Sequence, residues 1–227
     1  MQWLIDFLML FLPSNCLVCG KRLHAPGVIL CFICEMKMPR TGFGDRDNNP
    51  VSKIFWGRVR VRAGTSLFRF EKGSAYQALL HDLKYRGNQK AGLYLGRLLG
   101  QELKNTSFAD CDLMVPVPLH RRKLKQRGYN QSELIARGAS DITGIPIGSN
   151  LIRRTGYQRS QTTMNRQERF ENMALAFSLC DDVPDLDDKK ILIIDDIITT
   201  GATLEACSQV LLSHFKCMVY IATVSYA

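Results

Sequence analysis

Apolar and polar residues follow one another along this chain in blocks that are typical of an α/β protein. The clearest block is a continuous apolar run at 191–194 between polar residues, which predicts a parallel strand covered on both faces. Small and hydroxyl-bearing residues follow at 199–203, and apolar positions then recur at helical spacing from Leu204 to His214. This stretch predicts a strand, a tight loop and the N-terminus of a helix.

Weaker patterns predict the other elements of the domain. Apolar spacing is helical from 74 to 103 except at 85–89, so we expect two helices separated by a break. His81, Lys84 and Arg86 border this break, where they either cover a ligand or face solvent. Further patterns predict strands at 59–70, 145–152 and 218–224, a first central strand at 111–118, a highly basic loop after it, and a helix that begins near Tyr129. The expected fold is a doubly wound parallel sheet of the α/β class.

Length and composition allow one domain of this kind with a small appendage. The chain has 227 residues, 46% of them apolar, which is enough for a proper core. We expect an amphipathic docking helix at 1–12, a metal module at 13–40, a linker rich in Gly, Asp, Asn and Pro at 41–52, and the α/β domain at 53–227. The N-terminal stretch has no basic residue before Lys21 and is too short to span a bilayer, so the expected compartment is the cytosol and membrane-surface contact is disfavoured.

Four cysteines near the N-terminus have the spacing of a metal site. They form two Cys-x2-Cys pairs separated by eleven residues, which predicts a structural, tetrahedral four-thiolate zinc site made by Cys16, Cys19, Cys31 and Cys34. Disulfides and free thiols are the alternatives, but reducing conditions oppose the first and the pairing opposes the second. The other four cysteines show no pairing pattern, and we expect them to be small core residues.

Positive charge is concentrated in one part of the chain. The net charge is +9, and residues 119–169 contain eleven Lys and Arg against three Asp and Glu. Such a patch suits a polyanion, either a diphosphate or a nucleic-acid backbone, and the alternative is a solvated basic surface. Arg127 with Gly128 is the expected diphosphate contact, because backbone amides are free where a helix starts, and nucleic acid is the competing ligand for the outer arginines.

Two adjacent acids stand at the end of the 191–194 run, where open α/β sheets place their ligand crevice. The loop after Asp195 and Asp196 leads into a helix N-terminus, whose free N–H groups and positive dipole end suit a phosphate. Gly201 lets the backbone close around an oxyanion. This combination suits a ligand with a phosphate and vicinal sugar hydroxyls; the alternative is an ordinary buried strand with acids that cap the helix.

The thirteen residues ILIIDDIITTGAT at 191–203 resemble the 5-phosphoribosyl 1-diphosphate (PRPP) binding signature of type I phosphoribosyltransferases at every position. The resemblance implies that Asp195 and Asp196 form the catalytic pair that holds the ribose hydroxyls, and that the 5-phosphate lies on Thr199, Thr200, Gly201, Ala202 and Thr203. It implies that Mg²⁺ bridges the diphosphate and the ribose, and that the basic loop holds pyrophosphate through Arg121, Arg122, Lys123, Arg127 and Gly128.

A polar and basic segment at 153–171 has little to bury, and we expect it to be mobile. In type I phosphoribosyltransferases a flexible hood closes over PRPP from this position and excludes water. The candidates for the closing face are Arg154, Thr155, Gln161, Arg166 and Asn172. The alternative is an exposed loop with incidental charge.

Four motifs occur in a fixed order over almost the whole chain. They are the cysteine pairs, then VPVP with the basic loop and RGYNQSELIA, then the segment RTGYQRSQT, and last the PRPP signature. Together these motifs resemble the ComF family of competence-associated, phosphoribosyltransferase-like proteins, which includes the GntX proteins. The resemblance implies a zinc ribbon at 13–40 and a role in DNA uptake on the cytoplasmic side of the membrane. It also implies single-stranded DNA and DNA-uptake helicase machinery as partners.

Three functional hypotheses are consistent with these motifs. The first is a ComF protein that binds PRPP and Mg²⁺, with transferase activity. The second is a conventional nucleotide-salvage or amide phosphoribosyltransferase, against which the extra metal module argues; an N-terminal cysteine for glutamine chemistry is also absent, because Gln2 follows Met1. The third is a ligand sensor or DNA-binding adaptor on the same fold.

Overall fold

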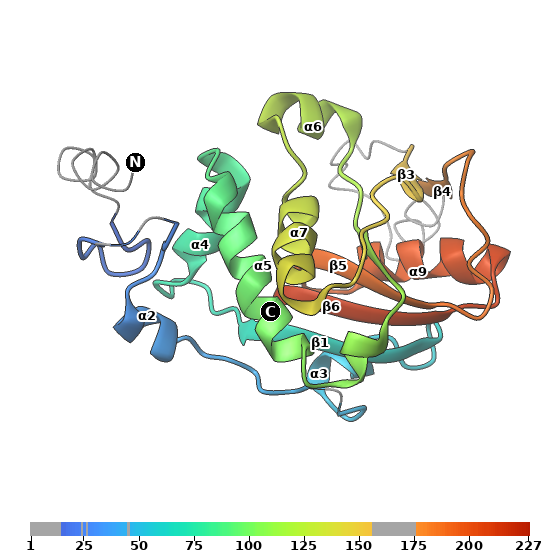
Figure 1. Cartoon of the computed structure of the whole chain (residues 1–227), viewed down its shortest axis with the longest axis horizontal. Helices are drawn as coiled ribbons and strands as arrows, with labels where there is room; N and C mark the ends of the chain where they lie inside the picture. The colour runs from blue at the N-terminus through green and yellow to red at the C-terminus, as the bar shows by residue number, and fades with distance from the viewer. Residues whose placement is uncertain (1–14, 24, 26, 45, 156–175) are drawn as a thin grey trace, which may run out of the picture.

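The computed structural model describes residues 15–23, 25, 27–44, 46–155 and 176–227 (Figure 1). The helix expected at 1–12 lies outside these residues, as do the hood candidates Gln161, Arg166 and Asn172.

A four-stranded parallel sheet forms the centre of the molecule, with the strand order β1-β6-β5-β2. Every residue of β5 from Ile191 to Asp196 is buried, as a strand covered on both faces requires. The strand continues past the apolar run and past both acids. The four strands are β1 (Val61–Arg69), β2 (Leu113–Pro116), β5 (Lys190–Ile198) and β6 (Met218–Tyr226).

Two details of the expected sheet are wrong. The strand β2, which we expected at the centre, lies at the edge, because the strand expected at 145–152 does not form beside it. Instead the chain makes a single bridge between Met114 and Ile147, next to Pro146, which has no N–H to donate. A separate two-stranded antiparallel sheet is formed by β3 (Ile152–Arg154) and β4 (Phe177–Leu179).

The predicted pair of helices with a break between them is confirmed as α4 (Gln77–Tyr85) and α5 (Gln89–Leu103). Asn88 caps α5 by accepting a hydrogen bond from the N–H of Ala91 at 3.2 Å. Figure 1 shows α5 beside α7 (Gln131–Thr143), and the two backbones meet at glycines. A Cβ atom on Gly96 would lie 2.2 Å from the carbonyl oxygen of Ile135, so only glycine allows this approach.

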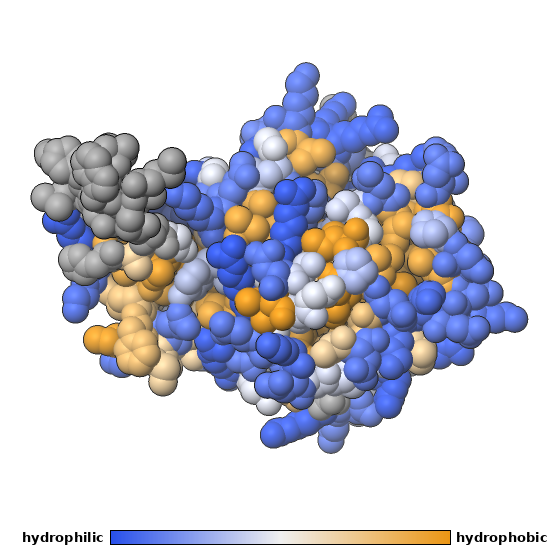
Figure 2. Space-filling model, in the orientation of Figure 1, coloured by the Kyte–Doolittle hydropathy of each residue, from blue (hydrophilic) through white to orange (hydrophobic). Residues whose placement is uncertain are grey.

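The expected basic loop after β2 contains a seven-residue helix, α6 (Arg121–Arg127). The side chain of His120 accepts a hydrogen bond from the N–H of Arg122 at 3.2 Å, and the left-handed Gly128 ends the helix. Hydrophilic side chains gather over α6 at the top of the view in Figure 2. Within the described residues, the other helices are α2 (Phe32–Met36), α3 (Pro50–Lys53), the 3-10 turn η1 (Ser107–Asp110) and α9 (Ala202–His214).

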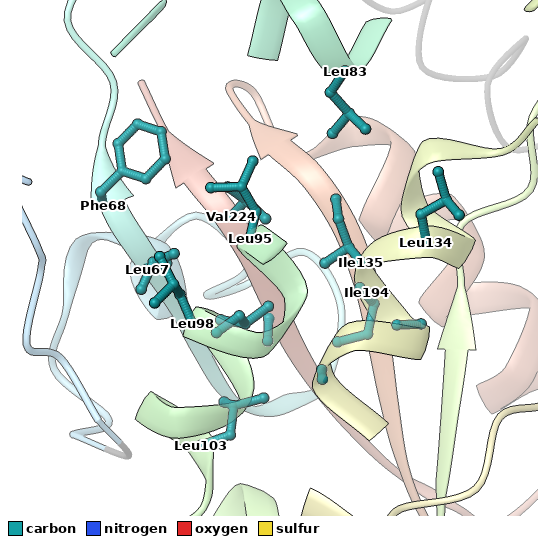
Figure 3. Close-up of a cluster of buried hydrophobic side chains, with 14 of the residues drawn as sticks. Leu67, Phe68, Leu83, Leu95, Leu98, Leu103, Leu134, Ile135, Ile194 and Val224 are labelled. Carbon is teal, nitrogen blue, oxygen red and sulfur yellow. The ribbon is translucent and has the colours of Figure 1, made fainter. Parts of the chain in front are cut away.

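Alternate residues of β5 enter two separate cores. Leu192 and Ile194 pack with α4, α5 and α7, as the close-up in Figure 3 shows for Ile194 beside Leu134 and Ile135. Ile191 and Ile193 enter the other core, with side chains from α9. The doubly wound architecture thus follows from one strand that is apolar on both faces.

Candidate functional site

The acids of β5 form the buried centre of the candidate site. Asp195 is 9% exposed and Asp196 is 3% exposed. The Ser132 hydroxyl donates to Asp195 Oδ1 at 2.8 Å, and the Asp196 N–H donates to the same oxygen at 2.9 Å. Burial raises the pKa of Asp195, and the neighbouring Asp196 carboxylate raises it further; the two hydrogen bonds and the charge of Lys84 lower it, but less.

Lys84, in the last turn of α4, is the cation that faces this pair. Its ammonium group lies 2.9 Å from Asp196 Oδ2, and its side chain is largely buried. The residues at the helix break were expected either to cover a ligand or to face solvent, and Lys84 faces the candidate site. Arg86 instead pairs with Asp82 at 3.3 Å, and the His81 ring lies against the Tyr85 ring, with centroids 5.1 Å apart.

Sequence reasoning missed Ser132, although a local signal was present. Asn130 caps α7 by accepting a hydrogen bond from the Ser132 N–H, and its own side chain donates to the Val117 carbonyl. These bonds fix the first turn of α7 at the end of β2, so the Ser132 hydroxyl reaches β5. A cap residue within RGYNQSELIA, next to a strand end, predicts such a polar contact.

The loop 199–201 turns the chain from β5 into α9. Gly201 has φ +76° and precedes the helix, so the first-turn amides of α9 face the loop. A Cβ atom at Gly201 would lie 2.4 Å from Ile54 Cγ2, which makes glycine necessary here for space as well as for conformation. A small cavity is lined by Asp195, Ile197, Ile198, Thr199, Thr200, Gly201, Ala202, Thr203 and Leu204. The structure therefore brings the predicted phosphate loop and Asp195 to one cavity.

Arg58 braces this loop from outside. Its Nη1 atom donates to the carbonyl oxygens of Thr200 at 2.9 Å and Ile54 at 3.0 Å, and its Nη2 atom pairs with the Glu205 carboxylate. Glu205 lies in the first turn of α9 and is 1% exposed. Sequence reasoning missed both residues; a carboxylate inside an otherwise apolar helical pattern is the signal that predicts a buried partner.

A second, larger cavity lies between the end of α4 and α6. Its volume is about 400 Å³, and its lining residues are Lys84, Tyr85, Gly87, Lys123, Gln126 and Arg127. Of the predicted pyrophosphate residues, Lys123 and Arg127 line it. The expectation of a free amide at Gly128 is wrong, because Gly128 ends α6 rather than starting a helix, and its N–H donates to the Leu124 carbonyl at 2.7 Å. Arg121 and Arg122 lie at the other end of α6.

Two of the predicted hood residues lie in or next to β3. The Arg154 guanidinium lies 5.2 Å from the centroid of the Phe177 ring, and the Thr155 N–H donates to the Ala176 carbonyl at 2.9 Å. The other predicted hood residues fall outside the described part of the chain, so closure over a ligand stays a prediction.

The four N-terminal cysteines lie together. Their Sγ atoms are all within 4.8 Å of one another, and those of Cys19 and Cys31 are 3.7 Å apart. A tetrahedral metal with bonds of about 2.3 Å to sulfur separates its ligands by about 3.8 Å, so the geometry fits. Tyr76, the residue before α4, joins the cluster to that helix, because its hydroxyl donates to the Cys34 carbonyl at 2.7 Å. These thiols could hold one metal ion.

Comparison with known proteins identifies similar sequences. Residues 130–227 match the family model of the phosphoribosyl transferase domain. The chain is 32% identical over 100 residues to competence protein F of Haemophilus influenzae, with 44% of each chain covered. It is 31% identical to DNA utilization protein YhgH of Salmonella typhi, with 63% of each chain covered. It is 25% identical to competence protein ComFC of Streptococcus pneumoniae, with 87% of this chain and 93% of the relative covered.

The matched part thus spans 44% to 63% of the length of the first two relatives. Among the residues that the structure describes, no helix combines the length and the apolar character needed to cross a membrane.

Proposed function

The chain belongs to the ComF family of phosphoribosyltransferase-like proteins, and from this premise we propose that it binds PRPP with Mg²⁺ and transfers the phosphoribosyl group. The observation that carries the proposal is the buried carboxyl pair of β5, of which Asp195 lines one cavity together with a loop at a helix N-terminus. A sugar phosphate with free hydroxyls has the matching chemistry.

The roles of the residues follow from their chemistry. Asp195 and Asp196 accept hydrogen bonds from the ribose 2- and 3-hydroxyls, and the loop of residues 199–203 donates to the 5-phosphate. Mg²⁺ bound with PRPP beside Asp195 and Asp196 would supply positive charge to the diphosphate leaving group. Because Ser132 and Lys84 hold the two carboxylates, the ribose meets groups that are already oriented, which lowers the cost of binding.

The diphosphate has cationic partners near this site. Lys123 and Arg127 line the cavity into which Lys84 also projects, and Arg121 and Arg122 extend the positive charge along α6. The reaction breaks the bond between the ribose C1 atom and the diphosphate oxygen and forms a bond from C1 to a nitrogen of the acceptor, which loses a proton. The hood that begins at Arg154 and Thr155, with Gln161 and Arg166, excludes water during this step.

The metal in the cysteine cluster is zinc in this proposal. Four thiolates leave no open position for a substrate, so the ion supports the N-terminal module and takes no part in the transfer.

The cellular role in this proposal is DNA uptake on the cytoplasmic side of the membrane, with single-stranded DNA and the helicase machinery of uptake as partners. The names of the relatives, competence protein F, ComFC and DNA utilization protein, support this role. The excess of eleven basic over three acidic residues at 119–169 supports a polyanionic partner.

Two assays test the proposal. Pyrophosphate release from PRPP should be stimulated by single-stranded DNA or by nucleobases, and it should be absent in Asp195→Asn; no release with any acceptor would overturn the transferase part. In a competent bacterium that lacks its own ComF protein, the native chain should restore transformation and the Asp195→Asn, Asp196→Asn variant should not. Full restoration by that variant would replace the proposal with a DNA-binding adaptor.

A further inference from the structure

The cavity between α4 and α6 has one wall that phosphate binding does not explain. Tyr85, the last residue of α4, is 70% exposed, yet it lines this cavity together with three cationic side chains. A diphosphate needs cations and N–H donors, and an aromatic ring offers it neither. We infer that this cavity, when PRPP is absent, binds a nucleotide unit, with the base stacked on Tyr85 and its phosphate on Lys123 and Arg127, the side chains that the proposed function gives to the diphosphate of PRPP. The inference deepens the proposed function and rests on it for the nucleic-acid context.

Two side chains lie beside the Tyr85 ring. The His81 ring lies 5.1 Å from it, centroid to centroid, and the Arg127 guanidinium lies 5.9 Å from its centroid. The side chain of Arg127 is itself fixed by a hydrogen bond to Gln131. Bases stack on tyrosine rings and on arginine planes alike, so these two residues offer adjacent flat surfaces. Because both are positioned before the ligand arrives, little side-chain entropy is lost on binding.

The charge of the cavity fits a phosphate beside that base. Lys84, Lys123 and Arg127 line it, and none of the described residues that line it is acidic. Gln126 adds an amide, which can both donate and accept hydrogen bonds at the edge of a base. Beyond the cavity, Arg121, Arg122 and Lys125 continue the positive surface along α6, where hydrophilic side chains gather in Figure 2. A basic track that leads from an aromatic platform is the arrangement by which proteins bind single strands.

The cavity has the size and the position that a nucleotide needs. The cavity has a volume of about 400 Å³, within the range of roughly 300–1,000 Å³ found for small-molecule sites and ample for a nucleotide. Lys84 lines the cavity and also pairs with Asp196 at 2.9 Å, so one side chain separates the base from the carboxyl pair. A strand held on Tyr85 therefore lies next to the proposed ribose site.

The test compares two labelled twelve-residue oligonucleotides, one of thymidine and one abasic, by fluorescence anisotropy without PRPP or Mg²⁺. Both carry the same phosphates, so their difference in affinity measures the bases alone. The native chain should bind the thymidine strand about 5- to 150-fold more tightly, as expected for one stacked base. Tyr85→Leu should remove this difference and Tyr85→Phe should keep it. Since the Tyr85 side chain is mostly exposed, both variants should have the same melting temperature as the native chain.

Three controls make the result specific. Trp56→Leu removes another exposed aromatic residue that has a cation, Lys53, near its ring, and it should leave the base preference intact. Lys123→Ala should weaken the binding of both strands equally, and it should reduce the slope of the logarithm of the affinity against the logarithm of the salt concentration by about 0.7. The Asp195→Asn, Asp196→Asn variant should keep the base preference, so that failure of PRPP binding and failure of this site are distinguishable.

A competition with thymidine monophosphate separates the two sources of the ligand. Competition that depends on Tyr85 would identify a free nucleotide as the ligand, and its absence would identify a strand; either result supports the stacked site. Equal affinity of the native chain for the thymidine and abasic strands would overturn the inference. A base preference that survives in Tyr85→Leu would overturn it as well.

Discussion

Replacement of Arg58 by methionine tests the brace behind the phosphate loop. The substitution keeps an aliphatic side chain but removes the cation that pairs with Glu205 and donates to the carbonyls of Thr200 and Ile54. In this variant the buried Glu205 carboxylate loses its ion-pair partner. We expect lower stability and weaker phosphate binding, because the loop of residues 199–201 loses its support.

The magnitude follows from the burial of the two partners. Removal of one partner from a fully buried ion pair costs about 3–5 kcal/mol. The Arg58 side chain is 34% exposed, so water reaches the site, and we reduce the expected loss to about 2–3 kcal/mol. For a chain of this length the melting temperature should fall by roughly 4–12 °C. Glu205→Gln should cost only about 1 kcal/mol, since the remaining Arg58 can be solvated.

A double-mutant cycle separates the ion pair from the other contacts. Urea unfolding of the native chain, the two single variants and Arg58→Met, Glu205→Gln should give a coupling energy of about 1–2 kcal/mol. Arg62→Met is the matched control, because Arg62 pairs with the exposed Asp47 and its loss should change little. Additive losses, or an Arg58→Met variant as stable as the control, would refute the brace.

Three further predictions concern the metal, the loop glycine and the buried carboxyl group. One zinc ion should be released per chain by a chelator, as measured by metal analysis; Cys19→Ser should lose it and Cys180→Ser should retain it, whereas equal metal content would contradict the assignment. Gly201→Ala should destabilise by about 2–3 kcal/mol, against about 1 kcal/mol for Gly144→Ala, which has a similar φ but open space at its Cβ position; equal losses in thermal unfolding would show that the Ile54 contact is unimportant. The pKa of Asp195 is raised, so the folded state holds this proton more tightly than the unfolded state, and stability should fall as the pH rises from the ordinary carboxyl pKa toward the raised one. The melting temperature of Asp195→Asn should fall less over this pH range than that of the native chain. Identical pH profiles for the two proteins would contradict the raised pKa of Asp195.

Much of the fold could be predicted because local patterns encode it. The apolar run at 191–194, the turn residues at 199–201 and the helical spacing after them predict β5, the loop and α9 in the right order, although β5 continues past the apolar run to Ile198. The break at 85–89 separates α4 from α5 for an equally local reason, a glycine with positive φ followed by a capping asparagine. Such features need no knowledge of the tertiary structure.

The order of the strands was harder to predict, because it depends on pairing between distant segments. An apolar run such as β2 shows that a strand is buried, but it does not show whether the strand lies at the centre or at the edge of a sheet. Pro146 was evidence in the sequence against a full strand at 145–152, because proline has no N–H to donate to the hydrogen bonds between strands. The helix α6 was hidden by its composition, since its exposed basic residues give no apolar periodicity.

The site shows the same division between local and distant information. Asp195, Asp196 and the loop are adjacent in the sequence, so a motif reveals them together. Lys84, in α4, and Arg58, in the turn between α3 and β1, come from distant parts of the chain and reach the site only through the fold. No spacing rule connects Lys84 with Asp196, and their 2.9 Å ion pair could be found only in three dimensions.

The most direct measurement is a calorimetric titration of PRPP with and without Mg²⁺. It should compare the native chain with Asp195→Asn, Asp196→Asn and with a matched control, Asp181→Asn, Asp182→Asn, which neutralises another adjacent pair of acids that is exposed. We predict micromolar, Mg²⁺-dependent binding for the native chain and the control, and none for the β5 variant. Equal binding by all three proteins, or no binding by the native chain, would contradict the account.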